Sequence, residues 1–272
     1  MPADLEGKFR LSSYAKGLFP YLETGSAVKK AIKKKLIKLN DKIGNTGDWV
    51  IAESTISYEL TYTLPEKDTN SVEIFYEDHD LLIVRKPPGI SSSGNVRSLQ
   101  HHLHSVPILD YDGSLPYPYL VHRLDKATEG LLIAAKNIET RRLLAKMLEN
   151  HSIVKSYVCI VEGKMDKSLK WITTDIDGKP AKTEILKTTV LDTRDITSKV
   201  FVTLHTGRTH QIRKHFSEIG HPIVGDNLYN KEGLSFRTGL LLCAYYLEFD
   251  HPMTHEKVNV EYPIPFKISK YK

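Results

Sequence analysis

Cysteine is scarce in this sequence, and long apolar runs are missing from it. Only Cys159 and Cys243 occur among 272 residues, which excludes a disulfide framework and a thiolate zinc site. No stretch approaches the ~18 consecutive apolar residues of a membrane-spanning helix, and residues 1–10 lack the apolar segment of a signal peptide. We therefore expect a soluble protein of the reducing cytoplasm.

Glycine and proline are also modest, at 16 and 13 residues, beside 40% hydrophobic and 26% charged residues. These values exclude collagen-like, low-complexity and disordered chains. The length is sufficient for a sizeable core, either in one large domain or in a large and a small one.

Acidic residues fail to balance basic residues only at the start of the chain. Residues 1–52 contain 10 Lys and Arg against 5 Asp and Glu, whereas residues 53–272 contain 28 of each class. The net charge of +5 therefore belongs to the first fifth of the sequence. A basic module joined to a neutral one typically binds nucleic acid or an acidic membrane surface.

Within the basic module, residues 26–39 (SAVKKAIKKKLIKL) predict one helix with Ser26 as its N-cap. Its apolar stripe consists of Val28, Ile32, Leu36 and Leu39. No acidic residue lies among the lysines off this stripe, which include Lys29, Lys30, Lys33 and Lys34. Such a face repels itself, so we expect an anionic partner to compensate it; a merely solvated face is the alternative.

A polar connector at residues 65–70 places a domain boundary near residue 60. We therefore expect a small, basic, α-rich domain over 1–60 and a second domain over 61–272. The second domain has two predicted helices, at 137–148 with Asn137 as N-cap and at 209–219. Its strands are predicted at residues 72–76, 81–84, 130–135, 156–161, 181–190, 199–206 and 239–249. Strands interrupted irregularly by few helices indicate an α+β fold with a mixed, mainly antiparallel sheet.

Three segments concentrate polar residues in apolar surroundings. They are LVHRLDKATEG at 120–130, KSY at 155–157 and TGRTHQIR at 206–213, the last followed by GHPIVGD at 220–226. Charged groups packed there are costly unless they find partners. A structural ion pair of Arg123 and a plain core position for Tyr157 are the alternatives to a functional site. Whether Arg208 and Arg213 point to the same place stays open at this level.

These segments resemble the pseudouridine synthases of the RluA type. The resemblance covers about residues 71–266 in the family's order and also includes YEDHDLLIVRKPPGI, GKPAKTEIL and LLLCAYYLEFDHP. Residues 9–52 resemble the small S-four-type RNA-binding domain that many of these enzymes carry. The chain departs from the family pattern at Arg85, where Asn is usual, and at Glu129, where Ser is usual.

The resemblance implies an isomerase that converts uridine to pseudouridine in ribosomal large-subunit RNA or transfer RNA. It implies a monomer with RNA as its partner, no membrane, no metal and no organic cofactor. Asp125 matches the catalytic aspartate, Arg213 its basic partner and Tyr157 the residue that stacks on the flipped uracil. Arg123 matches the arginine that enters the RNA where the nucleotide leaves. Further RNA contacts are expected from His122, Arg208, Lys29, Lys30, Lys33 and Lys34.

Two other classes of function remain open. A non-catalytic RNA-binding protein has no use for a carboxylate that faces phosphates, so Asp125 beside Arg213 argues against it. A metal-dependent hydrolase would use His101, His102 and His104, or His205, His210, His215 and His221. The histidines are spread along the chain without a carboxylate pair at ligand spacing, which favours the synthase.

Overall fold

The computed structural model describes residues 7–18, 22, 24–58, 72–95, 97–106, 115, 117–191, 196–230 and 239–271. The chain divides into two compact units, one of residues 1–70 with 94–96 and one of residues 71–93 with 97–272. We call them the N-terminal unit and the sheet unit. The predicted boundary near residue 60 falls on residues 59–71, which lie outside the described residues.

The N-terminal unit is mixed in structure rather than α-rich as predicted. It contains β1 (Phe9–Arg10), α1 (Leu11–Tyr14), α2 (Gly25–Lys33), β2 (Ile37–Leu39), β3 (Lys42–Ile43), β4 (Trp49–Val50) and β5 (Ile56–Tyr58). β1 pairs with β4, and β2 lies between β3 and β5, all antiparallel. The two helices and these short strands bury one apolar cluster, which includes Leu11, Val28, Ile32, Ile37 and Val50.

Helix α2 is shorter than the predicted helix over 26–39. The side chain of Thr24, not Ser26, caps it by accepting a hydrogen bond from the Ala27 amide at 3.1 Å. At the other end Lys35 has a φ of +60°, and the amides of Lys35 and Leu36 donate to the carbonyls of Ile32 and Ala31. This is a Schellman motif, which stops a helix.

The prediction that this helix continues to Leu39 was therefore wrong. The remaining residues form strand β2, where Ile37 is fully buried between neighbouring strands. Sheet pairing with β3 and β5 outweighs the helical spacing of the apolar residues, which is a weak constraint over one turn. Lys29, Lys30, Lys33 and Lys34 are exposed on this shorter helix.

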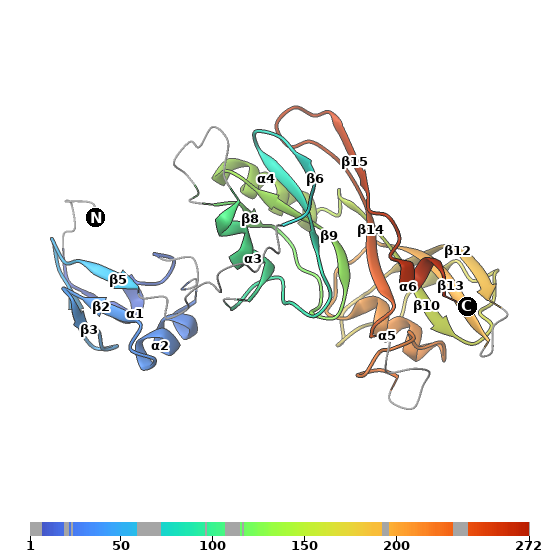
Figure 1. Cartoon of the computed structure of the whole chain (residues 1–272), viewed down its shortest axis with the longest axis horizontal. Helices are drawn as coiled ribbons and strands as arrows, with labels where there is room; N and C mark the ends of the chain where they lie inside the picture. The colour runs from blue at the N-terminus through green and yellow to red at the C-terminus, as the bar shows by residue number, and fades with distance from the viewer. Residues whose placement is uncertain are drawn as a thin grey trace. The chain divides into compact units, whose positions relative to one another are not determined.

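A single ten-stranded sheet organises the sheet unit (Figure 1). Its main path runs β11-β12-β13-β10-β14-β9-β7-β6, with β15 beside β14 and β8 beside β9. Among the described strands only β9 and β14 pair in parallel, so the predicted mixed, mainly antiparallel sheet is confirmed. The bounds are β6 Ile74–Glu77, β7 Leu81–Lys86, β8 Tyr119–Leu120, β9 Glu129–Ala135, β10 Val154–Glu162, β11 Trp171–Ile172, β12 Thr183–Leu191, β13 Thr197–Leu204, β14 Leu242–Asp250 and β15 Lys257–Glu261.

Helices cover both faces of this sheet. α3 (Leu99–His102), its following 3-10 turn (Leu103–Ser105) and α5 (Gln211–Glu218) contribute to one apolar cluster with Leu82 and Val84 of β7. α4 (Ile138–Glu149) and α6 (Phe266–Ser269) contribute to the other cluster with Leu81 and Ile83. Alternate residues of β7 thus point to opposite faces, as strand geometry requires. None of the described helices is long and apolar enough to cross a bilayer.

Both predicted helices of this unit are confirmed. Asn137 caps α4 by accepting a hydrogen bond from the Thr140 amide at 2.8 Å. α5 begins two residues later than predicted, and the chain leaves it through Gly220, whose φ is +79°. The α5 face of the sheet is the one that carries the site described next.

Candidate active site

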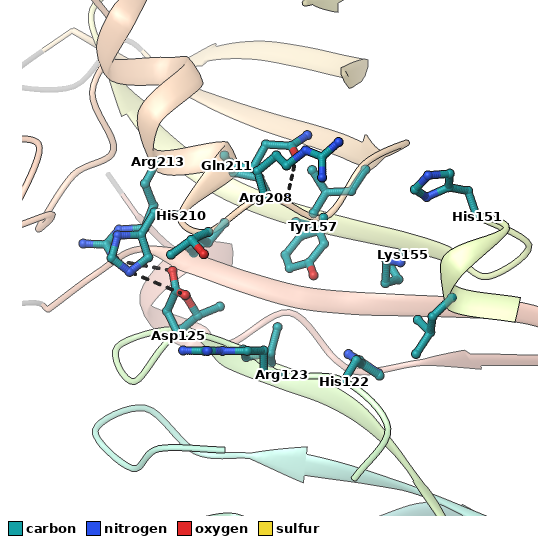
Figure 2. A pocket seen from close by; sticks show the side chains of 18 of the residues that line it. His122, Arg123, Asp125, His151, Lys155, Tyr157, Arg208, His210, Gln211 and Arg213 are labelled. Atoms are coloured by element: carbon teal, nitrogen blue, oxygen red, sulfur yellow. Dashed lines mark hydrogen bonds and ion pairs between the residues drawn. The ribbon is translucent and has the colours of Figure 1, made fainter. Parts of the chain in front are cut away.

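The three polar segments meet in one cavity of about 540 Å³ on the α5 face of the sheet (Figure 2). One wall is the loop that leads into β9, another is the start of β10, and the third is the turn that opens α5. The cavity is lined by all six of the site residues that the sequence placed in this unit: His122, Arg123, Asp125, Tyr157, Arg208 and Arg213. The four lysines of α2 belong to the N-terminal unit.

Asp125 lies in a loop that two buried side chains hold in place. The hydroxyl of Ser92 donates to the carbonyl of Leu124 and accepts from its amide, both at 2.9 Å. The ammonium of Lys86, itself fully buried, donates to the carbonyl of Lys126 at 3.2 Å. The loop then enters β9 at Gly130, where a Cβ would lie 2.1 Å from the carbonyl oxygen of Ala244. These contacts present the carboxylate of Asp125 to the cavity with 20% of its side chain exposed.

Arg213 projects from α5 toward two carboxylates. Its Nε and Nη2 donate to Asp226 at 2.7 Å each, and its Nη1 lies 3.4 Å from Oδ2 of Asp125. Burial would raise the pKa of Asp226, but the hydrogen bonds from Arg213 and from the amides of Leu228 and Tyr229 hold that pKa below its ordinary value. Arg213 therefore has one permanent anionic partner, and it offers its remaining amino group to Asp125.

His210 approaches the other oxygen of the same carboxylate. Its Nε2 lies 3.7 Å from Oδ1 of Asp125, and its Nδ1 lies 2.9 Å from the hydroxyl of Tyr229. The sequence predicted roles for neither His210 nor Asp226 in this site. Asp226 was detectable as the acid that ends GHPIVGD, thirteen residues after Arg213; nothing local distinguishes His210 from the other histidines.

Tyr157 projects from β10 into the cavity (Figure 2). It pairs with Val202 of β13 and Ala244 of β14, and the β10–β14 register shifts between Ser156 and Tyr157. Burial raises the pKa of Tyr157, so the hydroxyl stays protonated at neutral pH. A flat, buried ring that lines the cavity is suited to stacking on a planar base.

The remaining cavity residues differ in how strongly they are tied to the protein. Arg123 is exposed and makes no hydrogen bond or ion pair within the described part of the chain, so the structural ion pair considered above is not found there. Arg208 donates from Nε to the carbonyl of Pro180 at 3.0 Å. His122 accepts the amide of Ile133 at 3.1 Å, and burial lowers its pKa to about 3, so its ring is neutral.

Comparisons with known proteins place this chain in a family. Residues 80–218, half of the chain, match the RNA pseudouridylate synthase family. The chain belongs to this family.

An "uncharacterized RNA pseudouridine synthase" of Aquifex aeolicus is 31% identical over 89% of this chain and 87% of its own length. Ribosomal large subunit pseudouridine synthase D of Neisseria meningitidis serogroup A is 32% identical over 86% of this chain and 70% of its own. The solved structure of Human RNA Pseudouridylate Synthase Domain Containing 1 covers 72% of this chain and is itself covered to 84%, with 28% identity and a TM-score of 0.57. The protein is an RNA pseudouridine synthase of the RluA type, and so an isomerase that acts on RNA.

Arg85 and Glu129, the two departures from the family pattern, form an ion pair with each other in this synthase. Arg85 Nη2 lies 3.5 Å from the carboxylate of Glu129, which is only 3% exposed, and Lys267 of α6 lies 2.7 Å from the same carboxylate. Neither Arg85 nor Glu129 lines the cavity. A buried carboxylate needs such cations, so the pair ties β7, β9 and α6 together away from the site.

Three histidines of the metal hydrolase alternative have separate partners in the synthase. His205 pairs with Glu184, His215 with Thr183 and His221 with the carbonyl of Glu162. The described residues contain one three-residue group at ligand distances, formed by Asp78, Asp80 and His251.

Both ring nitrogens of His251 in that group already face polar partners within the protein. His251 Nδ1 accepts the amides of Met253 and Thr254, so the ring proton lies on Nε2, which faces Asp78 at 3.0 Å. Neither ring nitrogen of His251 then keeps a lone pair for a metal ion.

Proposed function

We propose that this synthase flips a uridine out of structured RNA into the Asp125 cavity and isomerises it with Asp125 as the catalytic carboxylate. The observation that carries the proposal is the convergence of Asp125, Tyr157 and Arg213, from three distant segments, on one cavity. The enzyme acts as a cytoplasmic monomer.

The reaction requires the N-glycosidic bond of uridine to break, the base to turn, and carbon 5 to join the sugar. Asp125 serves as nucleophile or base, which needs its ionised form in a site dry enough to protect the intermediate. The guanidinium of Arg213 favours that form, since an adjacent positive charge stabilises a carboxylate. Its 3.4 Å contact with Asp125 supports this role.

Flipping the base costs roughly a few kcal/mol. Stacking of the uracil on Tyr157 contributes about 1–3 kcal/mol. Arg123, which makes no hydrogen bond or ion pair among the described residues, fills the gap left in the RNA. Arg208 and His122 contribute to the RNA-facing rim of the cavity. Together these contacts offset the cost of opening the RNA.

The substrate class is ribosomal large-subunit RNA or transfer RNA. The similarity to ribosomal large subunit pseudouridine synthase D of Neisseria meningitidis supports the first. The test is to map pseudouridine in total RNA from a strain that lacks this gene and from its parent. At least one pseudouridine should disappear and return when the gene is restored. Identical maps in all RNA classes would contradict the proposal.

We further propose that the N-terminal unit is an S-four-like RNA-binding domain that supplies affinity without chemistry. Its support is the +5 net charge of residues 1–52 and the exposure of the α2 lysines. Replacing Lys29, Lys30, Lys33 and Lys34 by Gln should weaken RNA binding while the helix persists, because Gln is a comparable helix former. The slope of log K against log salt should flatten by up to about 3 to 3.5, at about 0.7 to 0.9 for each phosphate released.

The measurement is a salt titration of binding to one structured RNA. A matched control replaces four exposed lysines of the sheet unit outside the cavity, Lys164, Lys167, Lys170 and Lys187. An unchanged slope for the α2 variant would show that its lysines are a solvated face and that the cavity alone holds the RNA.

A further inference from the structure

His210 is held beside Asp125 through Tyr229, which is bound by Asp226, the acidic residue that also binds Arg213. Asp226 accepts hydrogen bonds from both the guanidinium of Arg213 and the amide of Tyr229. The hydroxyl of Tyr229 in turn contacts Nδ1 of His210 at 2.9 Å. The hydroxyl of Ser217 fixes Tyr229 further by donating to its carbonyl. Arg213 and His210 therefore flank the two oxygens of Asp125 from one rigid support (Figure 2).

The backbone of His210 is strained, and its surroundings enforce the strain. Its φ of +58° lies in the left-handed region, which costs a residue with a Cβ about 1–2 kcal/mol. The buried side chain of Gln211 locks the turn by accepting from the Thr206 hydroxyl and the Arg208 amide and donating to the carbonyl of Lys182. Strain that is over-determined in this way concentrates at functional sites.

The ring of His210 is a neutral base at neutral pH. Burial lowers its pKa below the ordinary value; nearby Arg213 and Lys214 act in the same direction, while Asp125 and Asp226 oppose it. Tyr229 completes the set of titratable groups that face it. Two other side chains beside Asp125 are poor proton acceptors, because the Tyr157 hydroxyl is protonated and Arg213 has no lone pair.

We propose that His210 accepts the proton that carbon 5 of the uracil must lose, a role that rests on the proposed function of Asp125. After carbon 5 has joined the sugar, its C–H bond breaks and the proton passes to Nε2 of His210. The electron pair forms the C5–C6 double bond, and the former C6–N1 double-bond pair moves to N1, which takes up a proton. One proton is lost and one gained, so the isomerisation balances without a co-reactant.

His210→Asn and His210→Gly test this role. Both residues tolerate a left-handed backbone, and neither side chain accepts a proton from carbon. We expect kcat to fall by about 10²-fold or more, as for loss of a general base, while RNA affinity changes little. With RNA deuterated at carbon 5 of the target uridine, a primary isotope effect absent from the wild type should appear in His210→Asn. Added imidazole should restore part of the rate of His210→Gly.

His255→Asn is the matched control, because His255 is exposed, has a φ of +61° and lies outside the cavity. A near-normal kcat for His210→Asn, or an isotope effect equal to that of the wild type, would overturn the inference. Failure of imidazole to restore any rate would also count against it. If Asp125→Asn is inactive while His210→Asn is normal, only this inference fails; if Asp125→Asn is active, the proposed function itself fails.

Discussion

Asp125→Asn should abolish pseudouridine formation and leave the fold intact. Asn keeps the shape of the side chain and removes the negative charge that a nucleophile or a base needs, so we expect a loss of about 10³-fold or more. The fold should persist because Arg213 keeps its two 2.7 Å hydrogen bonds to Asp226 and loses only the longer contact to Asp125. The measurement is pseudouridine formed per enzyme in single-turnover reactions, together with urea unfolding.

Asp175→Asn provides the control, since Asp175 is an exposed aspartate of the same unit outside the cavity. Its activity and stability should equal those of the wild type. More than trace activity in purified Asp125→Asn, at normal stability, would show that another group carries the chemistry.

Arg213→Ala should lose both activity and stability. Removing the guanidinium leaves Asp226 buried without its cation, which typically costs about 3–5 kcal/mol in the free energy of unfolding. Asp125 loses the adjacent guanidinium, 3.4 Å away, at the same time, so pseudouridine formation should fall as well. The loss of stability follows from the two hydrogen bonds to Asp226, which only the tertiary structure shows.

A double variant separates the two effects. Asp226→Asn in the Arg213→Ala background removes the uncompensated charge, so stability should partly return while activity stays low. Should activity return with stability, Arg213 serves the fold and not Asp125.

The same pair predicts how stability depends on pH. The folded-state pKa of Asp226 is lowered, so its contribution is complete above the ordinary aspartate pKa of about 3.9 and is lost as pH falls through the folded value. Unfolding measured at pH 7 and near pH 3 should show this loss in the wild type and a smaller one in Asp226→Asn.

Local sequence signals were sufficient for most elements of the sheet unit. Strand β7 shows a short apolar run, and α4 shows an N-cap followed by periodic apolar residues. Such signals depend on neighbours within one or two turns, so they are readable from the chain alone. The same reasoning predicted too long a helix at α2. Ile37 instead pairs with Tyr58 of β5, and this pairing depends on a strand that begins nineteen residues further along the chain.

The chemistry of the site was also partly contained in the sequence. The polar segments around Asp125, Tyr157 and Arg213, with their family resemblance, predicted the cavity and the synthase activity. Only the tertiary structure decided that Arg213 is shared between Asp226 and Asp125, and that His210 faces Asp125. Asp125 and Arg213 are 88 residues apart in sequence, and the direction of a side chain across that distance depends on how β9, β10 and β14 align. The sequence by itself indicated Asp125, Tyr157 and Arg213, whereas packing of the sheet against α5 brought His210 and Asp226 to them and determined which groups touch.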